Sequence, residues 1–155
     1  MTGKFGIRTS WRAKLEKMQE AKIVPVPPRM QKTCGTGAML VPRPLDVDAA
    51  IREVPKGRLV TVNQLRSRLA RQFQADMTCP LVTGIAVRLA AEAAEEDARA
   101  GLKRITPYWR VLREGGRCNQ KHPGGVEAQT ERLRAEGHTV ESGRVRYFEK
   151  RLVAW

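Results

Sequence analysis

Residues 54–65, VPKGRLVTVNQL, carry the local signals that decide the fold. Pro55-Lys56-Gly57 breaks a preceding helix, and Arg58-Leu59-Val60 gives a brief extended stretch. Thr61 and Gln64 then have capping-box spacing, in which the threonine hydroxyl accepts from the N3 amide and the glutamine reaches back to the cap. The helix predicted to follow has an apolar stripe of Val62, Leu65, Leu69 and Phe73 and a solvent side of Arg66, Arg68 and Arg71.

A second helix is predicted after a short polar turn over residues 74–79. Pro80 suits its first turn, because the missing amide hydrogen would have been unpaired there anyway. We expect it to run to about Ala100 and to complete a helix-turn-helix. Glu92, Glu95, Glu96 and Asp97 make its second half acidic. Only its first half can therefore face a polyanion, and the carboxylates must point away or pair with the chain's own arginines.

Further elements are predicted on both sides of this pair. Asp46 caps a helix that ends at Pro55, and Gly124-Gly125 opens one that stops at Gly137. An extended segment over residues 105–112 and a turn at residues 114–117 suggest a hairpin or wing. Ser142-Gly143 lies between two extended segments of a basic tail and indicates a hairpin there.

The first 45 residues are predicted to be an extended basic arm. Ser10 can cap a short helix with Trp11, Leu15 and Met18 on one face, and the following segment is rich in proline. This arm lies along phosphate or wraps its own domain; its basic residues are Lys4, Arg8, Arg12, Lys14, Lys17, Lys22, Arg29 and Lys32. The expected fold is mainly α: a winged helix-turn-helix over residues 46–140 with a small β-hairpin wing, the arm over residues 1–45 and a basic tail over residues 141–155.

The composition favours a polyanionic partner over a small-molecule or membrane function. A formal net charge of +13 is far more than solubility requires, although some proteins are simply basic. The cysteines (34, 79 and 118) lack CxxC spacing, and His122 and His138 do not complete a zinc site, so we expect reduced thiols, no metal and no cofactor. No apolar signal core or membrane span is present, which predicts a cytoplasmic protein, associated with the nucleoid in a prokaryote.

The order of these segments resembles the DNA-binding domain of the alkylguanine-DNA alkyltransferase family, over about residues 46–138. In that family a Pro-Lys/Tyr-Gly segment precedes the helix-turn-helix, matched here by Pro55-Lys56-Gly57. A Pro-Cys-His-Arg-Val segment holds the methyl-accepting cysteine, and this chain has PYWRV at residues 107–111. A Gly-Gly and a helix ending in Glu-Gly close the pocket, matched by Gly124-Gly125 and Glu136-Gly137.

The departures from the family's motif point away from alkyl transfer. Tyr108 stands where the acceptor cysteine is expected and Trp109 where the histidine is expected, and a phenol without a neighbouring imidazole is a poor nucleophile. The resemblance places the family's tyrosine at Val62 and its base-displacing arginine near Thr83, with Arg88 about one turn later. Glu136 then has no histidine to polarise and is interpreted as a charge at the end of a helix.

The function expected from the resemblance is non-catalytic DNA binding of an alkyltransferase-like type. The protein would be a monomer that senses alkylated or extruded bases and passes the damaged site to a repair protein. Pro107, Tyr108, Trp109 and Arg110 would line the former active-site pocket, where the two aromatics either stack on a base or simply fill the space. The residues expected at DNA are Arg66, Arg68, Arg71, Thr83, Gly84, Arg88 and Arg110.

Two other functions remain open from the sequence. One is an interaction protein, or a general nucleic-acid-binding module, whose pocket is a relic. It docks partners on the acidic end of the helix predicted from Pro80 to about Ala100 and on the proline-rich arm. The other is an enzyme that uses Cys79 or Cys118, which is disfavoured because both are predicted to lie in turns.

Overall fold

The computed structural model describes residues 9–17 and 19–155, and it is mainly helical with three small sheets. Lys4 and Arg8 of the predicted arm and Met18 of the first helical stripe lie outside the described residues. The α-helices are α1 (Trp11–Glu16), α2 (Pro28–Cys34), α3 (Pro44–Arg52), α4 (Val62–Gln72), α5 (Pro80–Arg99) and α6 (Gly125–Ala135). Among the described residues, no helix combines the length and the apolar character needed to cross a membrane.

The two helices predicted to form a helix-turn-helix are present as α4 and α5. Thr61 Oγ1 accepts from the Gln64 amide at 3.1 Å, and Gln64 Oε1 accepts from the Thr61 amide at 3.1 Å, which confirms the capping box. Strand β4 (Met77–Thr78) occupies the turn, and Pro80 begins α5 as expected. The helix before this pair, α3, begins at Pro44, so Asp46 lies in its first turn and not at its N-cap as predicted.

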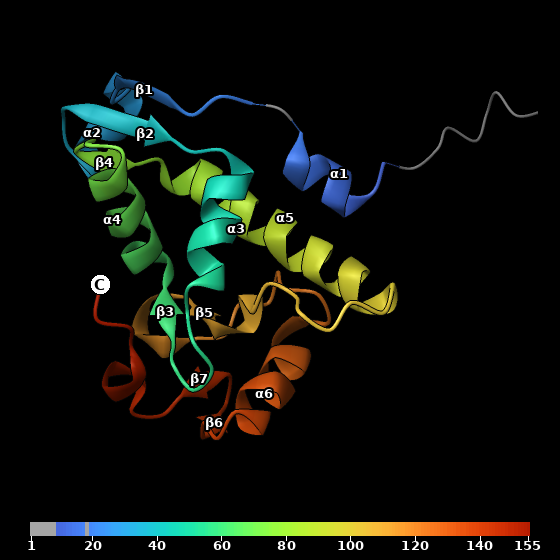
Figure 1. Cartoon of the computed structure of the whole chain (residues 1–155). Coiled ribbons are helices and arrows are strands. Elements are labelled where there is room, and N and C mark those ends of the chain that lie inside the picture. Colours follow the sequence, from blue (N-terminus) through green and yellow to red (C-terminus); the bar gives the residue numbers. More distant parts are fainter. Residues whose placement is uncertain (1–8, 18) are drawn as a thin grey trace, which may run out of the picture.

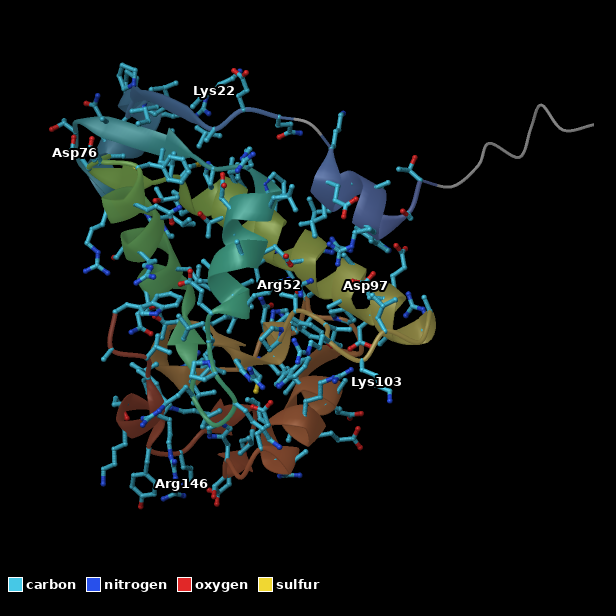
Figure 2. The ribbon with its side chains drawn as sticks, viewed as in Figure 1. Lys22, Arg52, Asp76, Asp97, Lys103 and Arg146 are labelled. Atoms are coloured by element: carbon cyan, nitrogen blue, oxygen red, sulfur yellow. The ribbon has the colours of Figure 1, made fainter. Side chains whose placement is uncertain are left out.

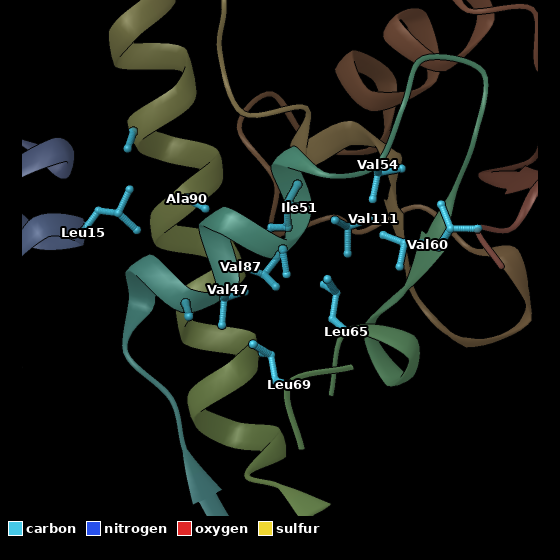
Figure 3. Packing of buried hydrophobic residues seen from close by; sticks show 14 of the residues in the cluster. Leu15, Val47, Ile51, Val54, Val60, Leu65, Leu69, Val87, Ala90 and Val111 are labelled. Atoms are coloured by element: carbon cyan, nitrogen blue, oxygen red, sulfur yellow. The ribbon is translucent and has the colours of Figure 1, made fainter. Parts of the chain in front are cut away.

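The main core lies where α3, α4 and α5 meet. Val47, Ile51, Leu65 and Leu69 are fully buried, and Val87 of α5 packs with them at 2% exposure. Figure 3 shows these side chains converging from the three helices, with Leu15 of α1 approaching α5 from the other side. The apolar stripe predicted for α4 is therefore the face that builds the core.

The N-terminal segment is part of the folded body, so its described part is not an extended arm, and of the two predicted placements the one against its own domain is observed. Strand β1 (Lys22–Pro25) pairs antiparallel with β2 (Ala38–Val41), and β2 pairs in parallel with β4. Helix α2 fills the connection, with Pro28 in its first turn. The prolines thus stand at a strand end and at a helix start, two positions where the missing donor costs nothing.

Helix α1 covers the second half of α5 (Figure 1). Ser10 Oγ accepts from the Ala13 amide at 3.0 Å, which confirms the predicted cap. The amides of Trp11 and Arg12 both donate to the Glu96 carboxylate, each at 3.0 Å, and the Arg12 guanidinium pairs with Asp97. The carboxylates of Glu96 and Asp97 thus pair with groups of the chain's own α1, as predicted for the acidic half of α5.

The predicted wing over residues 105–117 is not a regular hairpin. Strand β5 (Val111–Leu112) pairs in parallel with β3 (Val60–Thr61), and a single antiparallel bridge joins Arg113 to Arg117 around a tight turn at Glu114–Gly116. The pairing with β3 is favoured over a hairpin because it places Val111 and Leu112 in the core beside Val60, where all three side chains are at most 1% exposed.

The C-terminal residues close the molecule instead of forming a separate tail. Strands β6 (Val140–Glu141) and β7 (Arg144–Val145) form the hairpin predicted at Ser142-Gly143, so a boundary at residue 140 would cut it. Beyond it, the Leu59 amide donates to the Arg151 carbonyl and the Val153 amide donates to the Leu59 carbonyl, each at 2.9 Å. Val153 joins the main core.

Candidate nucleic-acid interface

The first half of α5 presents one stripe of side chains away from the core. Leu81, Gly84, Ile85 and Arg88 follow the i, i+3, i+4, i+7 spacing of a single helix face. Leu81 is 68% exposed and Ile85 is 53% exposed, which is unusual for large aliphatic side chains on a helix packed at its other side. A Cβ at Gly84 would meet nothing within 4 Å, so the stripe borders open space.

A loop over residues 113–121 lies opposite this stripe and is held by backbone contacts. The Arg113 amide donates to the Arg117 carbonyl at 2.8 Å, the Cys118 amide donates to the Gly143 carbonyl at 2.8 Å, and Arg144 Nε donates to the Gly115 carbonyl at 2.7 Å. Gly116 has a φ of +78°, and a Cβ there would collide with the Phe148 ring. The loop is thus a fixed wall.

A hollow of about 900 Å³ separates the α5 stripe from the loop, and we call it the basic groove. Asn63 and Val62 of α4 contribute to its lining, and Glu114 is the one carboxylate among the lining residues. Its cations are Arg88, Arg113, Arg117, Lys121 and Arg144, and within residues 9–17 and 19–155 none of them forms a salt bridge. The groove therefore carries a concentrated positive charge that the described part of the chain does not neutralise.

Two smaller hollows of about 240 and 280 Å³ adjoin the basic groove, since Asn63 lines all three. Arg71 lines one and Arg66 lines the other. Arg71 is exposed, whereas Arg66 is committed to the fold because its Nε donates to the Thr78 carbonyl at 2.9 Å. The concave surface thus extends from the groove along one side of α4.

The structure brings Gly84 and Arg88 to the basic groove and Arg66 and Arg71 to the hollows beside it, whereas the other predicted DNA contacts lie elsewhere. Thr83 is fully buried and its hydroxyl donates to the Cys79 carbonyl at 2.7 Å, so the prediction that Thr83 faces DNA is wrong. Position 83 falls on the core side of α5, about 100° from Gly84. Arg68 pairs with Glu53 at 2.8 Å and lies 4.9 Å from the centroid of the Trp155 ring, so its guanidinium is occupied as well.

Tyr108 and Trp109 are brought together, but inside the protein. Tyr108 is 1% exposed, and its ring packs edge-on against Trp109 and His122, with distances between ring centroids of 5.4 Å and 5.2 Å. Its hydroxyl donates to Glu95 at 2.6 Å, and burial together with this bond raises the pKa of Tyr108 well above its ordinary value. Pro107 is also buried. These side chains fill the space that the resemblance assigns to an active-site pocket.

Arg110 belongs to a buried ion pair and not to a DNA surface, contrary to its prediction as a phosphate contact. Its Nη2 donates to Glu136 at 2.7 Å and its Nη1 donates to the Val54 carbonyl at 2.7 Å. The Trp109 indole donates to the same carboxylate at 2.8 Å. Burial would raise the pKa of Glu136, but these donors outweigh it and lower that pKa, so Glu136 is a buried anchor instead of a solvated helix-end charge.

His122, Cys79 and Cys118 are buried side chains. His122 is 3% exposed, neither ring nitrogen has a hydrogen-bond partner among the described residues, and burial lowers its pKa to about 4. Cys79 and Cys118 are buried, and burial raises the pKa of Cys118, which opposes thiolate formation. No metal-binding group of histidine, cysteine and carboxylate side chains occurs in the described ranges.

Four of the groove's cations were missed from the sequence: Arg113, Arg117, Lys121 and Arg144. The first three recur every fourth residue in a segment whose glycines exclude a helix, so their spacing carried no helical meaning. A signal was available in REGGR, a glycine turn flanked by arginines, since such a turn exposes the side chains beside it. Arg144 reaches the groove only because the β6–β7 hairpin folds against this loop.

Neither a scan against protein-family models nor a search of curated proteins gives a match for this chain. The resemblance to the alkyltransferases therefore stays a prediction from motif order.

Proposed function

We propose that this protein binds duplex DNA in the basic groove and performs no covalent chemistry on it. The observation that carries the proposal is the set of five basic side chains in one hollow, none of them in a salt bridge with a described residue. A cluster of like charges opposes folding by self-repulsion, and a polyanion removes that cost on binding. The first half of α5 and the loop over residues 113–121 are the two walls that would meet the duplex.

The same geometry favours binding of intact duplex over sensing of an extruded base. Tyr108 and Trp109, the side chains that would stack on a flipped base, are 1% and 8% exposed. An incoming base would have to displace a ring that is held by the Glu95 bond and by edge contacts on two sides. The aromatic pair therefore supports the space-filling interpretation of the former pocket.

The test is duplex binding by fluorescence anisotropy over a salt series. Arg113→Ala together with Arg117→Ala should weaken binding and lower the slope of log K against log salt by about two, because each lost phosphate contact lowers it by about one. The control is Lys103→Ala with Arg104→Ala, which removes the same charge from exposed residues just beyond the other end of α5 (Figure 2). The last residue of α5, Arg99, lies about 27 Å along the helix from Leu81.

Two results would contradict the proposal. One is a wild-type protein whose binding is micromolar or weaker and independent of salt, which would favour a protein partner at this surface. The other is an equal change of slope in the groove variant and in the control, which would mean that net charge alone attracts DNA.

A further inference from the structure

The two walls of the basic groove differ in chemistry. Arg113, Arg117, Lys121 and Arg144 stand on the wall formed by the loop and the hairpin, whereas Leu81 and Ile85 stand on the α5 wall, with Arg88 one turn beyond. The cations of the first wall attract phosphate oxygens. An aliphatic side chain gains no favourable contact with phosphate, because its only apolar partners in a duplex are the bases and the sugar carbons.

We propose that Leu81 and Ile85 contact the bases of the bound duplex while the cationic wall holds its backbone. This inference rests on the proposed function and assigns the base-contacting residues within it. Leu81 and Ile85 are one turn apart on one face, and Gly84 between them carries no side chain that would hold a duplex away. An exposed aliphatic pair in a groove that also carries five cations is stabilised when bases exclude water from it.

The decisive comparison uses two polyanions, a random-sequence DNA duplex and inorganic polyphosphate, which carries charge but no bases. Leu81→Ala with Ile85→Ala should bind duplex about tenfold more weakly, with an unchanged salt slope, and should bind polyphosphate like the wild type. Arg113→Ala with Arg117→Ala should weaken both ligands. Leu102→Ala is the matched control, because Leu102 is 53% exposed like Ile85 but lies outside the groove lining.

A further pair of probes separates two kinds of base contact. Poly(dA)·poly(dT) and poly(dA)·poly(dU) differ only in the thymine methyl groups that line the major groove. A loss of wild-type affinity on the dU duplex that disappears in the Leu81→Ala, Ile85→Ala variant assigns the pair to methyl groups. Equal wild-type affinity for both duplexes, with the variant weaker on each, excludes the thymine methyl groups and leaves base faces between steps of the stack or sugar carbons as the contact.

The inference fails separately from the proposed function. If the arginine variant weakens duplex binding while the aliphatic variant binds duplex as the wild type does, the groove binds DNA but Leu81 and Ile85 do not touch bases. If the aliphatic variant weakens duplex and polyphosphate equally, the pair acts through the shape of the groove, and base contact is refuted. If the wild type does not bind duplex at all, the proposed function itself falls.

Discussion

The hydroxyl of Tyr108 lies 2.6 Å from a carboxylate oxygen of Glu95, which also accepts from Arg132 at 2.6 Å. This contact ties the position that the resemblance assigns to an alkyl acceptor to the inner face of α5. A phenol that already donates to a carboxylate, and whose pKa is raised, is not available as a nucleophile at neutral pH.

We expect no transfer of label when the protein is incubated with duplex that carries a radiolabelled methyl group on guanine O6. Tyr108→Cys alone should also transfer none, since the residue beside it is Trp109 and supplies no base. The measurement is label retained on the denatured protein, with a count of labelled residues. Stoichiometric label on any side chain of the wild type would refute the non-catalytic assignment.

Tyr108→Phe should lower the free energy of unfolding by about 1–2 kcal/mol, because it deletes the bond to Glu95 and keeps the ring. Tyr108→Ala should lower it by about 3–5 kcal/mol, because it opens a cavity in the cluster of buried side chains that includes Trp109, Leu112 and Leu133. Denaturant unfolding measures both. Duplex affinity below the unfolding transition should stay at the wild-type value in each variant; a selective loss on alkylated duplex would instead make Tyr108 part of a lesion site.

Glu136→Gln should lower the free energy of unfolding by about 3 kcal/mol, since it leaves Arg110 buried without its counter-ion. The side chains of this pair are only 12% and 7% exposed. The control is Glu141→Gln, which breaks the pair with Arg146, whose side chains are 50% and 57% exposed, and should cost less than about 1 kcal/mol. Equal losses would show that burial does not distinguish the two pairs.

Stability should fall as the pH is lowered from about 6.5 to about 4, and His122 should contribute to the fall. Its pKa is lowered from 6.5 to about 4, so between these pH values the His122 imidazole is protonated in the unfolded chain and neutral in the folded chain. The contribution is on the order of 3 kcal/mol, complete above pH 6.5 and lost below pH 4.

His122→Phe keeps a ring against Tyr108 and should flatten the pH dependence of unfolding in that window. The pKa of His138 is also lowered by burial, so a smaller slope should remain in this variant. An NMR titration in which the His122 resonances shift with a midpoint near 6.5 would contradict the assignment.

Arg71→Ala should lower the salt slope of duplex binding by about one, whereas Arg68→Ala should leave it unchanged. The difference follows from their partners, because Arg71 is exposed beside the groove and Arg68 is held by Glu53 and Trp155. Anisotropy titrations of both variants over one salt series measure it. A slope lowered by about one in both variants would show that the whole face of α4 meets DNA, and a slope unchanged in both would show that Arg71 does not contact phosphate.

The sequence by itself determined the elements whose signals are local. The capping box of Thr61 and Gln64, the first-turn proline at residue 80, the glycines that bound α6 and the hairpin turn at Ser142-Gly143 all appear where they were predicted. Each of these signals works between residues at most four apart, through one hydrogen bond or one φ angle. Such contacts do not depend on the tertiary contacts of the rest of the chain.

Only the tertiary structure decided which side chains face a partner. Thr83 and Gly84 are neighbours in sequence, yet one is fully buried and the other borders the groove, because the packing of α3 and α4 fixes the rotation of α5. Arg110 lies inside because Glu136, 26 residues later, is there to pair with it. Strand β2 pairs with β4 some 38 residues away in the same manner. Burial and charge pairing depend on contacts between elements that are far apart in the sequence, and local sequence signals do not determine those contacts.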